Sequence, residues 1–217
     1  MRKQFAVLGL GRFGTSLALT LAKMGHEVLA VDAHEETVEK IAGVVTKAVQ
    51  ADVHNEEALK SLGLRNFDTV VVAIGQDIQT SILVTVMLKE MGVKKLVAKA
   101  QNELHGKVLE KVGADMVIFP ERDMGIRVAH CLVSCRILDQ IQLSPEFSIA
   151  EINASHKMSG KTLGQLNLRS KMGINVLVIK RDNELMIAPG AETLINEQDI
   201  LVVLGSNKAI DNLGNHF

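Results

Sequence analysis

The sequence predicts an α/β protein whose N-terminal part is a doubly wound parallel sheet. Short apolar runs alternate with amphipathic helical patterns over residues 1–120. A glycine-rich loop at residues 9–14 separates the first apolar run from the first helical pattern, and an acid, Asp32, ends the second run. Alternating strands and helices predict a parallel sheet, and a glycine loop in this position is typical of a Rossmann-type fold.

The expected elements of this first domain follow one another in a regular order. The apolar runs predict strands at residues 5–8, 28–31, 48–50, 69–74, 96–100 and 117–119. The segments between them repeat apolar residues at helical spacing, which predicts helices at residues 15–24, 35–42, 56–62, 78–91 and 103–112. Since neighbouring parallel strands are joined by crossover helices, the sheet should carry helices on both faces.

Residues 121–142 predict one long crossover helix. Its apolar residues form two stripes, namely Met124, Val128, Cys131, Cys135 and Leu138, and Ile126, Val133, Ile137 and Ile141. Two interpretations stay open, because the helix either reaches a partner subunit or packs between its own sheet and the following domain. The two cysteines lie one helical turn apart, so we expect small apolar side chains in a reducing compartment rather than a disulfide or metal site.

From residue 143 onward the pattern changes to short strands and short helices. Strands are expected at 148–152, 176–180, 185–187 and 200–204, with Asp182 and Asn183 in a hairpin turn. Short helices are expected at 162–166, 169–172 and 208–213. Residues 143–217 therefore predict a small α+β domain, which is marginal on its own and should contact the first domain or a second copy.

The composition narrows the function classes. Lys and Arg together number 24 and Asp and Glu 25, so no net field draws the protein to nucleic acid or to an anionic membrane. The apolar runs are too short to span a bilayer, and the N-terminus lacks the features of a secretory signal. We therefore expect a cytoplasmic protein that binds no nucleic acid.

The glycine loop predicts a nucleotide site. Gly9 allows the tight turn, Gly11 lets the backbone approach a pyrophosphate, and Gly14 lets the helix pack closely on the sheet. Phosphate would rest on the free N–H groups of the following helix. Asp32 can accept hydrogen bonds from ribose hydroxyls. A glycine-rich turn without a ligand is the alternative.

The same motif would fit an NAD-dependent oxidoreductase, but the chain shows no clear catalytic set. No Ser/His/Asp or paired-carboxylate pattern stands out, and none of the histidines is expected to be a base held by an acid. A regulatory switch fits better. Arg12 would direct a cation at phosphate, and Glu121, after the sixth strand, would need Mg²⁺ or Ca²⁺ beside a phosphate. The alternatives are an exposed loop arginine and a first-turn helix acid.

The chain resembles the cytosolic regulatory subunits of bacterial potassium uptake systems, the KtrA/TrkA type built from RCK domains. The residues that carry the resemblance are 3–7 with 9–14, 25–32, 61–67, 71–75, 98–102, 107–111, 113–115 and 120–125. The resemblance implies a dimer that assembles into an octameric ring on a membrane potassium channel subunit of the KtrB/TrkH type. ATP and ADP, or alternatively NAD and NADH, would compete for the cleft and gate the pore, without catalysis.

The resemblance also implies roles for individual residues. Asp32 would hold the ribose, Asp52 would contact the adenine, Arg12 would bind the terminal phosphate, and Glu121 would meet a cation and the nucleotide across the dimer. The implied nucleotide-binding set is Gly9, Gly11, Arg12, Phe13, Gly14, Asp32, Asp52, Ala73, Ile74, Gly75, Lys99 and Glu121. Asp52 departs from the family pattern, because Val53 and His54 follow it where Ala and Thr are usual.

The C-terminal domain resembles RCK domains that bind cyclic di-AMP at a dimer interface. The positions that match the expected contacts are Arg169, Ile174, Asn175 and Pro189. A guanidinium can clamp a phosphodiester, and an isoleucine can cover an adenine. The alternative is that Arg169 is a surface cation and Ile174 a core residue.

Overall fold

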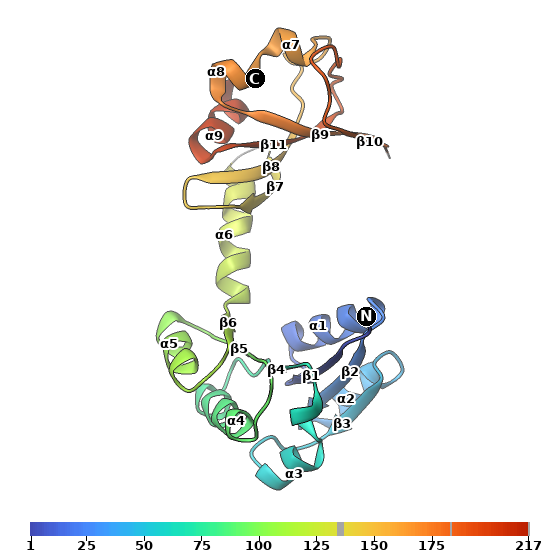
Figure 1. Ribbon diagram of the computed structural model, residues 1–217, viewed down its shortest axis with the longest axis vertical. Helices are drawn as coiled ribbons and strands as arrows, with labels where there is room; N and C mark the ends of the chain where they lie inside the picture. The colour runs from blue at the N-terminus through green and yellow to red at the C-terminus, as the bar shows by residue number, and fades with distance from the viewer. Residues whose placement is uncertain (134–136, 183, 217) are drawn as a thin grey trace. The chain divides into compact units, whose positions relative to one another are not determined.

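The computed structural model describes residues 1–133, 137–182 and 184–216, and Figure 1 shows its elements. The chain divides into two compact units, Met1–Arg122 and Asp123–Phe217, which we call the N-terminal and C-terminal units. Among the described residues, no helix is long and apolar enough to cross a membrane.

The N-terminal unit is a parallel sheet of six strands in the order β3-β2-β1-β4-β5-β6. Its strands are β1 (Gln4–Leu8), β2 (Glu27–Asp32), β3 (Lys47–Gln50), β4 (Thr69–Val72), β5 (Leu96–Lys99) and β6 (Met116–Ile118). Its helices are α1 (Arg12–Lys23), α2 (Glu35–Ala42), α3 (Glu56–Ser61), the 3-10 turn η1 (Leu64–Asn66), α4 (Ile78–Glu90) and α5 (Glu103–Lys111). The predicted doubly wound parallel sheet is confirmed.

Two apolar layers cover the two faces of this sheet. On one face, Val7 of β1 packs in a buried cluster with Ala18 of α1 and Ile41 of α2. On the other, Leu8 of β1 packs in a second cluster with helices α3, α4 and α5. Successive residues of a strand point to opposite faces, which explains why adjacent residues of β1 belong to different clusters. The core on both faces thus fixes the positions of the strand ends and of the loops that follow them.

Helix α1 begins three residues earlier than predicted. Its N-cap is Gly11, whose carbonyl accepts the N–H of Thr15 at 2.9 Å. Arg12, Phe13 and Gly14 are therefore helical. The apolar pattern misses this first turn because it holds an arginine and a glycine, residues that carry little signal of a buried face.

The predicted helix over residues 121–142 is wrong in its second half. Helix α6 (Pro120–Val133) is followed by strand β7 (Ile137–Gln142), which pairs antiparallel with β8 (Phe147–Asn153). The spacing of apolar residues at 137–142 fits a helix, but β8, which follows after residues 143–146, offers a pairing partner that the periodicity of this segment does not reveal. Cys135, which was expected on this helix, lies outside the described residues.

Four large apolar side chains in the part of α6 beyond residue 122 are exposed. Their exposed fractions are 54% for Met124, 52% for Ile126, 46% for Val128 and 77% for Leu132. Met124, Ile126 and Val128 belong to the two predicted stripes, and in the described chain these positions remain open to contact with another molecule.

The C-terminal unit holds an antiparallel sheet of five strands in the order β10-β9-β11-β8-β7. Its remaining elements are α7 (Leu163–Leu166), α8 (Leu168–Met172), β9 (Asn175–Arg181), β10 (Glu184–Ile187), β11 (Ile200–Ser206) and α9 (Asn207–His216). Ile210 and Leu213 of α9 are buried in the cluster that covers this sheet. The predicted small α+β domain is confirmed; Asn183 of the predicted hairpin turn lies outside the described residues.

An ion pair with a buried carboxylate joins β9 to the residue that precedes β11. Arg181 of β9 donates from Nε to Oδ1 of Asp199 at 2.8 Å and from Nη2 to Oδ2 at 2.8 Å. The Asp199 side chain has an exposed fraction of 0%, and its Oδ2 also accepts the N–H of Asn196 at 2.8 Å. Burial acts to raise the pKa of Asp199, but the hydrogen bonds from Arg181 and Asn196 outweigh it and lower the pKa.

Candidate functional site

The glycine loop makes a tight connection between β1 and α1. Gly9 has a φ of +91° and donates its N–H to the carbonyl of Val31 at 2.8 Å. A Cβ added to Gly14 would lie 1.9 Å from the carbonyl oxygen of Gly9, so only glycine lets the helix pack this closely on the loop. A Cβ on Gly11 would meet nothing within 4 Å, which leaves the backbone there open to a ligand.

A cleft of about 780 Å³ opens beside this loop at the carboxyl ends of the strands. Of the predicted residues, those that line it are Gly9, Gly11, Asp32, Asp52, Ala73, Ile74 and Gly75. They follow or end β1, β2, β3 and β4, which lie next to one another in the sheet. In open parallel sheets this edge is where ligands bind, and the volume suits a nucleotide.

Asp32 holds the loop and is largely buried. Its Oδ2 accepts the N–H of Leu10 at 2.6 Å, its Oδ1 accepts the N–H of His34 at 2.9 Å, and its side chain is 14% exposed. Burial acts to raise the pKa of Asp32, but these hydrogen bonds lower it below its ordinary value. The carboxylate is therefore charged at neutral pH and keeps lone pairs for a further donor.

Acid–histidine pairs occur twice in the cleft, which corrects the expectation that no histidine is held by an acid. The ring Nδ1 of His34 lies 3.0 Å from Oδ1 of Asp32, and that of His54 lies 2.8 Å from Oδ1 of Asp52. Hydrogen bonds from the backbone and side chain of His54 lower the pKa of Asp52. Both pairs share the spacing Asp-x-His, with Asp32 at the end of β2 and Asp52 two residues after β3, a signal that sequence reasoning missed.

The N-terminal turn of helix α4 also lines the cleft. Its N-cap, Asp77, accepts the N–H of Thr80 at 3.0 Å and the Thr80 hydroxyl at 2.6 Å. The hydrogen bond from the Thr80 side chain is the main cause that lowers the pKa of Asp77. Nε2 of His54 lies 2.7 Å from Oγ1 of Thr80, which links the loop after β3 to the first turn of α4. Asp77 and Thr80 were not predicted as site residues, although Asp-x-x-Thr is a recognisable capping pattern.

Five predicted residues do not line the cleft: Arg12, Phe13, Gly14, Lys99 and Glu121. Arg12 is an exposed residue at the start of α1. Lys99 donates to Oε1 of Glu121 at 2.6 Å, and its Nζ lies 5.9 Å from the centroid of the Phe13 ring. The same Nζ lies 2.9 Å from the position of a Cβ on Gly75, so Lys99 stands beside the cleft.

The described residues do not form a complete metal site. They contain no group of three or more His, Cys, Asp or Glu side chains that could hold a metal ion. At the predicted cation position, Glu121 is paired with the ammonium of Lys99, and this hydrogen bond is the main cause that lowers the pKa of Glu121. One chain thus supplies a single carboxylate that already has a cationic partner.

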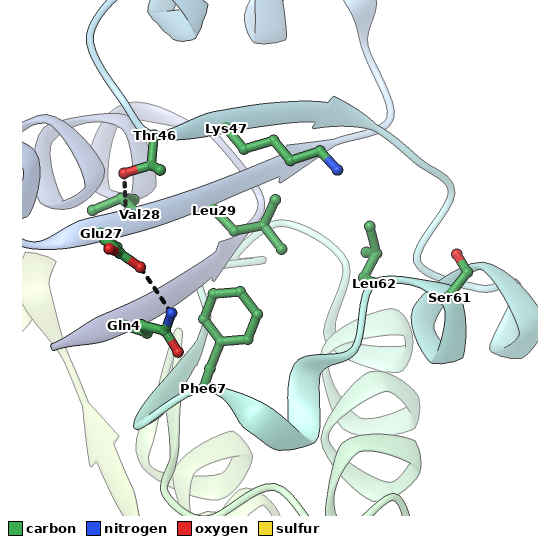
Figure 2. A pocket seen from close by; sticks show the side chains of 9 residues that line it. All are labelled: Gln4, Glu27, Val28, Leu29, Thr46, Lys47, Ser61, Leu62 and Phe67. Atoms are coloured by element: carbon green, nitrogen blue, oxygen red, sulfur yellow. Dashed lines mark hydrogen bonds between the residues drawn. The ribbon is translucent and has the colours of Figure 1, made fainter.

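A smaller cavity, of about 290 Å³, lies at the amino ends of the strands (Figure 2). Gln4 donates from Nε2 to Oε2 of Glu27 at 2.8 Å on its rim, and Leu29 and Phe67 form its apolar floor. Thr46 accepts the N–H of Val28 at 3.0 Å. None of the predicted site residues lines this cavity, because the glycine loop lies at the carboxyl ends of the strands.

The C-terminal unit has a pocket of its own, of about 330 Å³. All four residues predicted for a second ligand line it: Arg169, Ile174, Asn175 and Pro189. Ile174 is only 1% exposed and also belongs to the core, so both of its predicted roles are compatible. Asn167, also on the lining, has a left-handed φ of +48°.

Comparison with known proteins identifies the family. The TrkA-N domain model matches residues 5–120, and the TrkA-C domain model matches residues 147–217. The chain belongs to the KtrA/TrkA family of potassium uptake proteins. The resemblance drawn from the sequence is thereby confirmed.

Relatives of this KtrA/TrkA chain match it over nearly its whole length. It is 50% identical over 206 residues to Ktr system potassium uptake protein C of Bacillus subtilis, covering 95% of this chain and 93% of that protein. It is 48% identical over 213 residues to protein A of the same system and organism, covering 98% and 96%. The names of these relatives describe potassium uptake and no enzymatic reaction.

A solved structure shares the fold. The GsuK channel bound to NAD superimposes with a TM-score of 0.65 at 19% identity, covering 96% of this KtrA/TrkA chain and 38% of that chain. The chain thus spans little more than a third of the solved one. Sequence identity this low shows the common architecture alone.

Proposed function

We propose that the chain is a cytosolic, nucleotide-sensing regulatory subunit of a bacterial potassium uptake system, without catalytic activity. The observation that carries the proposal is the cleft formed by the glycine loop and Asp32, in a chain half identical to Ktr potassium uptake proteins. ATP and ADP, or alternatively NAD and NADH, are the proposed ligands. GsuK, which shares the fold, has been solved with NAD bound.

Helix α1 supports a phosphate site at the loop. Its N-cap is Gly11, which has no side chain to accept hydrogen bonds from the N–H groups of the first turn. The first N–H groups of a helix have no partner within the helix, so those of α1 are available to a phosphate. Asp32, at the end of β2, offers a charged carboxylate to the ribose hydroxyls. Asp52 and the backbone of residues 73–75 then line the adenine end.

Arg12 is the proposed sensor of the terminal phosphate. It is an exposed cation in the first turn of α1, beside the open backbone of Gly11. A charge-assisted hydrogen bond to phosphate is stronger than a neutral one. The Arg12 side chain would therefore contribute more to the binding of ATP, which has this terminal phosphate, than to the binding of ADP.

Removing the Arg12 side chain tests this assignment. For Arg12→Ala, isothermal titration calorimetry should show a loss of about tenfold or more in ATP affinity and less than about threefold in ADP affinity. Lys23→Ala, which removes a cation from the last turn of the same helix, should leave both affinities unchanged. Equal losses for the two nucleotides in Arg12→Ala would separate Arg12 from the terminal phosphate.

The oxidoreductase alternative is tested by the same titration with NAD and NADH. Binding of NAD species alone, together with hydride transfer in an absorbance assay, would contradict the regulatory proposal.

The proposed assembly is a dimer that builds an octameric ring against a membrane potassium channel subunit of the KtrB/TrkH type. The exposed apolar residues of α6 support a contact between copies, because large exposed apolar patches mark interaction sites. A nucleotide that prefers one ring state tenfold shifts the equilibrium by about 1.4 kcal/mol per site, so several coupled sites are needed for a sharp response.

A cation at Glu121, Mg²⁺ or Ca²⁺, would need further ligands from a neighbouring copy or the nucleotide.

We further propose that the pocket of the C-terminal unit binds cyclic di-AMP. Arg169 is exposed and carries a guanidinium suited to a phosphodiester, while Ile174 forms an apolar wall. Titration of cyclic di-AMP by calorimetry tests this proposal directly, and the absence of a binding signal would contradict it.

A further inference from the structure

The cavity at the amino ends of the strands combines polar walls of opposite charge with an apolar floor (Figure 2). The first residues of β1, β2 and β3 and the segment 61–67 surround it. None of its lining residues lines the nucleotide cleft, so the two sites are separate. Its volume of about 290 Å³ is at the lower end for ligand pockets, which favours a small ligand.

The start of β3 supplies hydrogen-bond donors. Lys47 lies two residues before Val49, which packs in the same cluster as Leu29, so alternation along β3 places the Lys47 side chain on the face of the cavity. Among the described residues, no ion pair or hydrogen bond engages the Lys47 ammonium. Thr46 accepts the N–H of Val28 at 3.0 Å, which leaves its hydroxyl proton for another acceptor. This wall therefore presents an uncompensated cation and a hydroxyl donor.

The starts of β1 and β2 supply acceptors. Oε2 of Glu27 accepts Nε2 of Gln4 at 2.8 Å, and this contact leaves Oε1 of the Gln4 amide as an acceptor. Oε1 of Glu27 lies 3.6 Å from Nε of Arg2, a distance longer than a hydrogen bond. The Glu27 carboxylate thus keeps lone pairs for a further donor. This second wall favours a cationic group.

The floor between the walls is apolar. Leu29 is only 5% exposed, and the half-buried Leu62 and Phe67 pack against the same cluster. A hydrocarbon or aromatic group placed on these side chains would leave water, which is favourable in proportion to the apolar area that it buries.

We propose that this cavity binds a free α-amino acid with an apolar side chain. The ammonium of the amino acid pairs with Glu27 and Gln4, and its carboxylate pairs with Lys47 and Thr46. Its side chain covers the apolar floor. An apolar anion or an apolar amine would pair with one wall and leave the charge of the other wall partly desolvated and without a partner, which is costly.

The test titrates L-leucine and L-phenylalanine into the full chain, with binding followed by saturation-transfer difference NMR. At least one of the two should bind saturably. We expect at least about tenfold weaker binding for 3-phenylpropanoate, which lacks the ammonium, and for 2-phenylethylamine, which lacks the carboxylate. Binding of either analogue as tight as that of L-phenylalanine would contradict the two-wall arrangement.

Two substitutions locate the ligand. Lys47→Met keeps the apolar stem and removes the cation, and Glu27→Gln removes the charge of the other wall; each should weaken binding at least about fivefold. The matched controls are Lys40→Met and Glu36→Gln, which break an exposed ion pair on α2, a helix that packs on the other face of the sheet. Both controls should bind as the wild type does, and circular dichroism should show native folding of all four variants.

A purely structural role for Lys47 predicts a different result. β3 is an edge strand, and a lysine there hinders pairing with another chain. If that is its only role, neither amino acid binds at about 10 mM, which is tenfold above a millimolar Kd, and the proposal fails. Binding that is unchanged in both Lys47→Met and Glu27→Gln would place the ligand elsewhere and would also overturn it. Neither result bears on the proposed nucleotide cleft.

Discussion

Gly14→Ala should destabilise the N-terminal unit by about 3 kcal/mol or more. The added methyl group would lie 1.9 Å from the Gly9 carbonyl oxygen and 3.1 Å from Cβ of Ala73, so α1 has to move away from the sheet. Alanine is the better helix former by about 1 kcal/mol, which means that propensity opposes the predicted loss. The chain has no Trp or Tyr, so urea unfolding is best followed by far-UV circular dichroism.

Gly11→Ala separates stability from binding. Its Cβ would meet nothing within 4 Å, and its φ of −63° suits alanine, so stability should stay within about 1 kcal/mol of the wild type. The methyl group would nevertheless occupy the open backbone where phosphate is proposed to approach, so ATP affinity should fall at least tenfold. Equal stability of Gly14→Ala and Gly11→Ala would contradict the packing argument.

Arg181→Met should destabilise the C-terminal unit by about 2 to 4 kcal/mol at neutral pH, since it leaves the buried Asp199 without its cation. This loss is at the lower end for buried pairs because the Arg181 side chain is 37% exposed. Hydrogen exchange of β9 and β11 measures the loss separately from the N-terminal unit. His156→Gln, which removes one partner of an exposed ion pair, should lower the free energy of unfolding by less than about 1 kcal/mol.

The pH dependence of this effect has a definite sign. In the wild type the pKa of Asp199 is lowered below 3.8, so its contribution is present above that pH and lost as the pH falls through the folded value. Without Arg181, burial raises the pKa, and the neutral carboxyl is tolerated in acid. The stability difference between wild type and variant should therefore shrink as the pH falls. A difference that is constant with pH would contradict the buried-charge explanation.

The fold of the N-terminal unit could be predicted because its signals are local. Each strand is an apolar run, each helix has an amphipathic pattern, and the loop at residues 9–14 marks the first connection. Strand β7 could not be predicted from periodicity, because its pairing with β8 depends on contacts outside the segment. The same limit explains why periodicity alone predicts too long a helix over residues 121–142.

The candidate site could be predicted where a sequence motif determines the local backbone geometry. The glycine loop and Asp32 lie on the cleft because the turn and strand end place them there. The contact of His54 with Thr80 joins residues far apart in the chain, so no local spacing in the sequence predicts it. Asp-x-His is visible in the sequence at Asp32 and Asp52, but its meaning depends on the short turn after each strand.

The most direct test of the account compares small-angle X-ray scattering of the protein saturated with ATP and with ADP. Saturation is first established by calorimetry for each nucleotide. A sensor of the terminal phosphate must bind one conformation better than the other, so the two curves should differ in their radius of gyration and pair-distance distribution. Superimposable curves at confirmed saturation would contradict nucleotide switching.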